Sequence, residues 1–213
     1  MDSDEMKKVK GGYNVYGYDI GILMLESNFP RIIGDVGNAL TYDFPVVHRC
    51  IKGVLPIDVV RGNNDNIVNL FIIAGKELQN EYGIKALTTS CGFLGKYQNI
   101  LTDELDIPVF TSSLIQLPTV SQLIRGKKTL IVTADADTLT DEYITNACGD
   151  VDRDTYRIVG TQGRTMTEYT VQNRLEVDAD QCAKDLIEVI DDVIYSTGGE
   201  AVGAIIVYEY AAA

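Results

Sequence analysis

Cys91 is the residue whose surroundings best fit chemistry. The stretch ALTTSCGFLGKY, residues 86–97, places it directly after an apolar run, behind three hydroxyl-bearing residues and in front of a glycine. If the run is a strand and the next residues open a helix, Cys91 lies near unpaired backbone N–H groups and the positive end of the helix dipole. Both favour the thiolate over the thiol.

The neighbours of this cysteine could hold a carboxylate. The candidate binding residues beside it are Thr89, Ser90 and Gly92, with Thr88 and the N–H group of Phe93 nearby. Such a site suits removal of a proton from the carbon next to a carboxylate, because it supplies a base and holds the anion that forms. The alternative is a small buried cysteine at a helix start, since free cysteine is among the most buried residue types.

A second group of polar residues lies in ESNFPRIIGDVGN, which follows the first apolar run. Ser27, Asn28, Asp35 and Asn38 are candidate ligand contacts in this loop. TADAD, residues 133–137, either lines the facing wall of a site or forms a solvated turn before a capped helix. We favour the solvated turn.

Composition excludes several classes of function. The chain has 213 residues, with 31 acidic against 18 basic ones and a formal net charge of −13, so we expect neither a nucleic-acid nor a membrane partner. Cys50, Cys91, Cys148 and Cys182 lack C-x-x-C spacing, which argues against a zinc site and a disulfide framework. No nucleotide-binding glycine motif occurs, so nucleotide binding has no support. The acidic clusters lack calcium-loop spacing, so we expect no metal. The polar start and the lack of a spanning apolar run lead us to expect a cytoplasmic protein.

Short β-rich runs alternate with helical patterns along the chain. We predict strands at residues 19–25, 44–50, 84–89, 107–110, 128–133, 156–160 and 201–208. We predict helices in the segment that ends at Gly83 and in the segment stopped by Gly198, and a third helix opened by a capping box of Thr138 and Asp141. This alternation predicts an α/β fold with parallel sheets flanked by helices.

The two ends of the pattern resemble each other. KALTTSCG and GAIIVYEY both follow a helix, and aligning Ala86 with Ala204 without gaps sets Glu209 against Cys91. We therefore predict two similar α/β domains, residues 1–113 and 114–213, with a site in the cleft beyond the carboxyl ends of their strands. Glu209 is a candidate second acid or base, if burial raises its pKa toward neutrality.

Four blocks taken in order resemble the aspartate/glutamate racemase family, in its "racemase family protein" branch. They are IIGDVGNALTYDFPVVHRCIKGV, ALTTSCGFLGKYQ, IPVFTSSLIQLP and LIVTADADTLT, and the resemblance runs from about Gly21 to the end of the chain. The family implies two domains related by a pseudo-twofold axis, a cofactor-independent site and a possible homodimer. It also implies one cysteine from each domain facing the substrate α-carbon, and Cys91 matches the first of these.

The second cysteine is not where the family implies it. After AVGAI the chain continues IVYEYAAA, so Glu209 or Tyr210 stands in its place. Our first interpretation is a racemase-like isomerase that acts by proton transfer on a small amino acid or carboxylate. The alternatives are a single-cysteine decarboxylase or cis-trans isomerase of small dicarboxylates, and a non-catalytic small-carboxylate-binding protein.

Overall fold

The computed structural model describes residues 10–62, 65–196 and 201–208. Its first half forms a four-stranded parallel sheet with the order β2-β1-β3-β4. The strands of this sheet are β1 (Ile20–Leu25), β2 (Val46–Ile51), β3 (Ala86–Thr89) and β4 (Val109–Phe110). Parallel strands need crossover connections, which helices supply except between β1 and β2, where a long loop with one 3₁₀ turn makes the crossover.

The second half repeats this order in a three-stranded parallel sheet, β6-β5-β7. Its strands are β5 (Lys128–Thr133), β6 (Tyr156–Gly160) and β7 (Val202–Val207). The predicted α/β class with two parallel sheets flanked by helices is confirmed. The pseudo-twofold axis and the domain boundary after residue 113 stay predictions.

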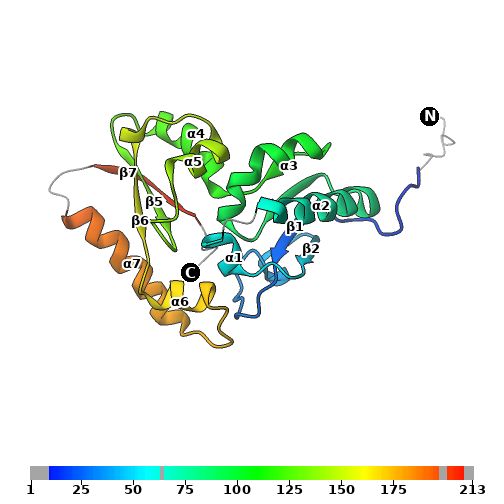
Figure 1. The fold of residues 1–213 in the computed structure, drawn as a ribbon, viewed down its shortest axis with the longest axis horizontal. Coiled ribbons are helices and arrows are strands. Elements are labelled where there is room, and N and C mark those ends of the chain that lie inside the picture. The colour runs from blue at the N-terminus through cyan, green and yellow to red at the C-terminus, as the bar shows by residue number, and fades with distance from the viewer. Residues whose placement is uncertain (1–9, 63–64, 197–200, 209–213) are drawn as a thin grey trace, which may run out of the picture.

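Helices cover the sheets (Figure 1). They are α1 (Pro56–Val60), α2 (Val68–Tyr82), α3 (Gln98–Glu104), α4 (Leu117–Leu123), α5 (Asp141–Cys148), α6 (Thr165–Val171) and α7 (Ala179–Ser196). The predicted stop at Gly83 is confirmed, because this glycine takes the left-handed conformation that ends α2. Gly198 lies outside the described residues. Among those described, no helix has the length and apolar character that crossing a membrane requires.

The predicted capping residue of α5 is wrong by two positions. Thr140, not Thr138, precedes the helix, and its hydroxyl accepts a hydrogen bond from Tyr143 N at 3.4 Å. Thr138 instead donates its hydroxyl to the carbonyl of Asp135 at 3.0 Å. That bond places Thr138 in the turn after β5, two residues before the position that caps the helix.

One hydrophobic cluster runs through both halves of the molecule. It joins Leu23 of β1 and Leu87 of β3 to Ile131 of β5 and Ile206 of β7. On the other face of the second sheet, Leu130 and Val132 pack against α7. The two sheets therefore share an apolar core, and their positions relative to each other are fixed by packing.

Asp135, at the carboxyl end of β5, is not in a solvated turn as we predicted. Its side chain is only 9% exposed and pairs with Arg61 at the end of α1, with 3.1 Å between Nη2 and Oδ2. Its other oxygen accepts hydrogen bonds from Asp137 N at 3.2 Å and Gln162 Nε2 at 3.3 Å. The pair joins the first half of the chain to the second, where α1 lies beside α6 (Figure 1).

We expect Asp135→Ala to lower the free energy of unfolding by about 2 kcal/mol, because it removes a charged hydrogen-bonding partner from a largely buried position. Glu104→Ala is the matched control. It breaks the exposed Lys76–Glu104 pair and should cost no more than about 0.5 kcal/mol. Urea denaturation of both variants measures the difference, and equal stability losses would contradict the assignment.

Candidate active site

Cys91 lies at the carboxyl end of β3, directly before the 3₁₀ helix η3 (Gly92–Tyr97). A hydrogen bond of 2.9 Å from Ser90 N to Leu23 O extends the pairing of β3 with β1 to the residue before the cysteine. Leu25 N donates to Ser90 Oγ at 3.3 Å. A helix does follow Cys91, but it is a short 3₁₀ helix, so the dipole beside the thiol is weaker than we expected.

Cys91 lines a small pocket, here called the cysteine pocket, with a volume of about 50 Å³. From the first half of the chain it is lined by Leu25, Phe29, Arg31, Pro56, Val60, Ser90 and Cys91. From the second half it is lined by Ala134, Thr170 and Val171. Most of these side chains are apolar. Arg31 is the one charged residue among the ten described residues that line the pocket. The pocket therefore combines a thiol, a cation and mostly apolar walls.

A second pocket, here called the hydroxyl pocket, adjoins the first at Ser90 and Cys91 and measures about 180 Å³. It is lined by residues 88–92, residues 110–113, Val36, Val207 and Tyr208. These residues include the ends of β3, β4 and β7, the edge at which ligands of parallel sheets bind. Cys91 therefore has open space on two sides.

Most of the hydroxyl groups predicted to hold a carboxylate form hydrogen bonds within the protein. Thr88 Oγ1 donates to Phe110 O at 2.8 Å, and Thr89 Oγ1 donates to Thr111 O at 2.7 Å. These bonds hold β4 beside β3. Ser90 differs, because it accepts from Leu25 N and can donate its own proton to a ligand. Of the three hydroxyls, Ser90 is the best placed to bind a carboxylate.

Gly92 is positioned for close contact with β7. A Cβ atom added to it would lie within 3 Å of the Tyr208 carbonyl oxygen and of the Tyr208 ring. The Phe93 ring also packs against the Tyr208 ring, with centroids 5.0 Å apart. The glycine therefore lets the end of β3 meet the end of β7, and its predicted contact with a ligand stays a prediction.

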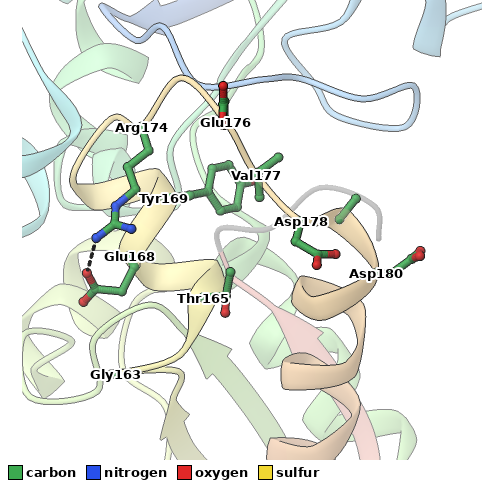
Figure 2. A pocket seen from close by; sticks show the side chains of 10 residues that line it. Gly163, Thr165, Glu168, Tyr169, Arg174, Glu176, Val177, Asp178 and Asp180 are labelled. Carbon is green, nitrogen blue, oxygen red and sulfur yellow. Dashed lines mark hydrogen bonds and ion pairs between the residues drawn. The ribbon is translucent and has the colours of Figure 1, made fainter.

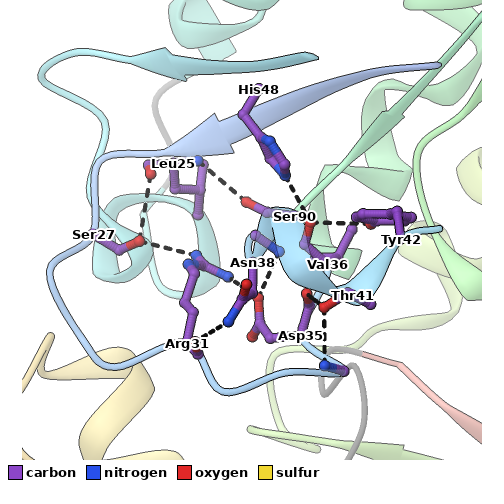
Figure 3. Close-up of polar contacts among 12 residues, drawn as sticks. Leu25, Ser27, Arg31, Asp35, Val36, Asn38, Thr41, Tyr42, His48 and Ser90 are labelled. Carbon is purple, nitrogen blue, oxygen red and sulfur yellow. Dashed lines mark hydrogen bonds and ion pairs between the residues drawn. The ribbon is translucent and has the colours of Figure 1, made fainter. Parts of the chain in front are cut away.

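The loop after β1 is organised around Arg31 (Figure 3). Its guanidinium donates from Nη1 to Asp35 Oδ1 at 2.7 Å and from Nη2 to Ser27 Oγ at 2.9 Å. Asn38 Nδ2 donates to Arg31 O at 2.8 Å. Three of the four predicted loop residues thus surround one arginine, while Asn28 is exposed and donates its backbone N–H to Asn173 Oδ1 at 2.6 Å.

Sequence reasoning missed Arg31. Its position in the loop, one residue after Pro30, carries no motif. The signal that could have found it is charge: it is the one basic residue in the segment ESNFPRIIGDVGN, which we had already linked to ligand binding.

A larger pocket lies elsewhere, between α6 and the start of α7, with a volume of about 820 Å³ (Figure 2). Glu168, Glu176, Asp178 and Asp180 line this acidic pocket. Its one cation, Arg174, pairs with Glu168 at 3.3 Å. This surplus of negative charge opposes binding of a carboxylate. Although this pocket is larger than the cysteine pocket, it is therefore the poorer site for an anionic group.

The remaining predicted residues do not supply a second acid within the described chain. Glu209 lies outside the described residues, and its role stays a prediction. Its neighbour Tyr208 donates its N–H to Val132 O at 2.8 Å, as Ser90 does to Leu23 O, so the two strand ends have corresponding registers. Burial raises the pKa of the Cys148 thiol to about 11, which keeps it protonated at neutral pH.

The chain is similar to proteins that are named lyases. No protein-family model matches the chain. Dimethylsulfoniopropionate lyase 3 of Emiliania huxleyi (strain CCMP1516) is 29% identical over 188 residues, 85% of this chain and 48% of that protein. Dimethylsulfoniopropionate lyase 7 of the same organism is 28% identical over 180 residues, 82% of this chain and 52% of that protein. Dimethylsulfoniopropionate lyase of Durusdinium sp. clade D is 29% identical over 155 residues, 70% and 51% of the two chains. The chain spans about half the length of these curated relatives.

These relatives overturn the family assignment made from sequence. The expected aspartate/glutamate racemase family, and with it the isomerase and amino-acid racemase activity, is wrong, because the matching proteins are named lyases. Of the alternatives, the single-cysteine decarboxylase is closer, since a decarboxylase is also a lyase. The blocks that suggested a racemase surround Cys91 and the loop after β1, and they carry no information on which bond breaks.

We expect Gly92→Ala to destabilise the protein by about 1–3 kcal/mol, because the added methyl group overlaps backbone atoms of Tyr208 that cannot move independently of β7. Gly12→Ala is the control, since an added Cβ there meets nothing within 4 Å. Thermal unfolding followed by circular dichroism measures both variants. A Gly92→Ala protein as stable as Gly12→Ala would show that the ends of β3 and β7 are not in close contact.

Alkylation of Cys148 by iodoacetamide should be about 100-fold slower at pH 8 than that of an unperturbed thiol, because the reactive thiolate forms only near a pKa of about 11 instead of 9.0. The rate should rise about tenfold per pH unit up to about pH 11. Mass spectrometry of the peptide that carries Cys148 measures this profile while the protein stays folded. A rate that levels off by pH 9 would contradict the burial of this thiol.

Proposed function

We propose that this chain cleaves dimethylsulfoniopropionate by elimination, with Cys91 as the base. The observation that carries the proposal is the position of Cys91 beside a cation in a mostly apolar pocket, in a chain whose relatives are named for this reaction. Identity of 28–29% over most of the chain supports a shared fold and site region. The substrate is taken from the names of the relatives, and its assignment to this chain is part of the proposal.

The reaction needs one base and a leaving group. The Cys91 thiolate removes a proton from the carbon next to the carboxylate, and the electron pair of that C–H bond forms a C=C bond. The bond between the neighbouring carbon and the positively charged sulfur breaks, and its electron pair leaves on sulfur as neutral dimethyl sulfide. The products are acrylate, dimethyl sulfide and the Cys91 thiol, which returns its proton to solvent, so atoms and charge balance.

Neighbouring residues support each part of this step. The Ser90 hydroxyl is free to donate to the carboxylate, on which negative charge increases as the proton leaves. The apolar walls formed by Leu25, Val60 and Val171 exclude water from the thiolate. Dimethyl sulfide is apolar and uncharged, so the same walls accommodate the leaving group.

The overall charge of the chain also fits this substrate. Dimethylsulfoniopropionate is a zwitterion with no net charge, whereas a dicarboxylate would be repelled by a protein with a formal charge of −13. Within the described residues the cysteine pocket supplies one cation, which matches a single carboxylate. A small molecule with one carboxylate thus fits better than the dicarboxylates we considered from sequence.

Purified protein should release dimethyl sulfide from dimethylsulfoniopropionate, and Cys91→Ser should lower kcat/KM by at least about 100-fold, the usual contribution of a general base. Headspace gas chromatography measures dimethyl sulfide, and proton NMR measures acrylate in equal amount. Cys50→Ser is the matched control, because this exposed cysteine on β2 should be replaceable with less than about a twofold effect.

Two results would contradict the proposal. One is release of dimethyl sulfide no faster than in buffer without protein. The other is equal activity of Cys91→Ser and wild type. Binding of substrate without cleavage would instead favour a small-carboxylate-binding protein.

A further inference from the structure

Arg31 presents a fixed cation to the cysteine pocket. Its side chain is 14% exposed, and its guanidinium lies between Ser27 and Asp35 (Figure 3). The planar guanidinium carries several N–H groups, of which Nη1 and Nη2 each donate one to these partners. Within the described chain, the other N–H groups are left for a ligand. Planar N–H donors of this kind suit a carboxylate, which accepts through two oxygens.

The contacts around Arg31 fix its orientation. Its guanidinium carbon lies 4.5 Å from the centroid of the Phe29 ring, and this ring also meets Tyr169 of α6, with centroids 5.4 Å apart at 87°. Asn173, in the left-handed conformation, accepts hydrogen bonds from the N–H groups of Asn28 and Phe29. Residues from both halves of the chain therefore hold the arginine in place, which lowers the entropy that ligand binding would cost.

If Arg31 had only a structural role, its ion pair with Asp35 would be enough to explain its charge. Asp35, however, does not line the cysteine pocket, and the described residues that do include no carboxylate. A ligand in this pocket meets a guanidinium and the Ser90 hydroxyl, with no carboxylate among the described lining residues. The pocket volume of about 50 Å³ exceeds the roughly 10–15 Å³ that one water needs, and is enough for a carboxylate group.

We propose that Arg31 binds the carboxylate of the substrate and, with Ser90, directs the carbon next to it toward Cys91. This inference rests on the proposed function for the identity of the substrate, but not for the carboxylate itself. Asp35 and Ser27 are positioning residues, because they act through the guanidinium. Neutralising the carboxylate also favours loss of the adjacent proton, since the anion that forms carries more charge on the carboxylate oxygens.

The test uses propionate, which has the carboxylate but no leaving group, so it reports binding independently of cleavage. Isothermal titration should give a Kd for propionate at least about tenfold weaker for Arg31→Gln than for wild type, a change of about 1.4 kcal/mol. Arg174→Gln, in the acidic pocket, and Cys50→Ser, at an exposed cysteine of β2, should stay within about twofold of wild type. Propionamide, the neutral analogue, should bind wild type at least about tenfold more weakly than propionate does.

A second measurement covers the case in which Arg31→Gln fails to fold. Propionate added to the wild-type protein should shift the Arg31 Nε–H signal in a nitrogen–proton NMR spectrum, with Arg31→Lys identifying the signal by its loss. Propionate binding that Arg31→Gln leaves unchanged, or an Nε–H signal that does not move, would overturn the inference.

These outcomes separate the inference from the proposed function. Dimethyl sulfide release with unchanged KM and propionate affinity in Arg31→Gln would overturn only the role of Arg31. Propionate binding that depends on Arg31, without any dimethyl sulfide release, would overturn only the lyase.

Discussion

The pairing of β3 with β1 is the constraint on which the candidate site depends. The hydrogen bonds from Ser90 N to Leu23 O and from Leu25 N to Ser90 Oγ join the carboxyl ends of the two strands. They bring Cys91, at the end of β3, beside the loop that follows β1 and carries Arg31. A shift of one residue would turn alternate side chains to the opposite face of the sheet, and the thiol would leave the pocket.

A buried cation that binds a ligand must be stabilised by the protein while the N–H groups that face the ligand stay available. Burying a guanidinium costs free energy unless its N–H groups are satisfied. The loop supplies these partners: Asp35 and Ser27 accept hydrogen bonds from the guanidinium. Gly37 N in turn donates to Asp35 Oδ1 at 2.6 Å. Asp135 and Arg61 meet a similar requirement at the corresponding end of β5. The Arg31–Asp35 pair lies in the loop after β1, and Asp135 lies just after the end of β5.

Local sequence patterns predicted the elements but not their mutual contacts. Continuous apolar runs such as Leu130–Val132 indicated strands covered on both faces, and the structure has all seven predicted strands within a few residues of their expected bounds. The short helices α1, α4 and α6 were missed, because five to seven residues are too few for a helical pattern. Cys91 was found because it follows a strand directly. Asp135 gains its importance from Arg61, far along the chain, and Arg31 from the pocket that it shares with Cys91. No single-sequence pattern records such contacts.

The same reasoning explains why the sequence suggested the wrong reaction. A thiol at a strand end, beside carboxylate-binding groups, is what any proton abstraction next to a carboxylate requires, whether the outcome is racemisation or elimination. The two reactions differ in the step after proton removal. Racemisation must return a proton to the opposite face, which requires a second acid there, whereas elimination expels a leaving group and requires none. Glu209 or Tyr210, which stands where the racemase interpretation required a cysteine, therefore has no required part in an elimination. In a lyase, specificity is set by how the leaving group is placed relative to the C–H bond, and a carboxylate fixed by Arg31 and Ser90 would determine that placement.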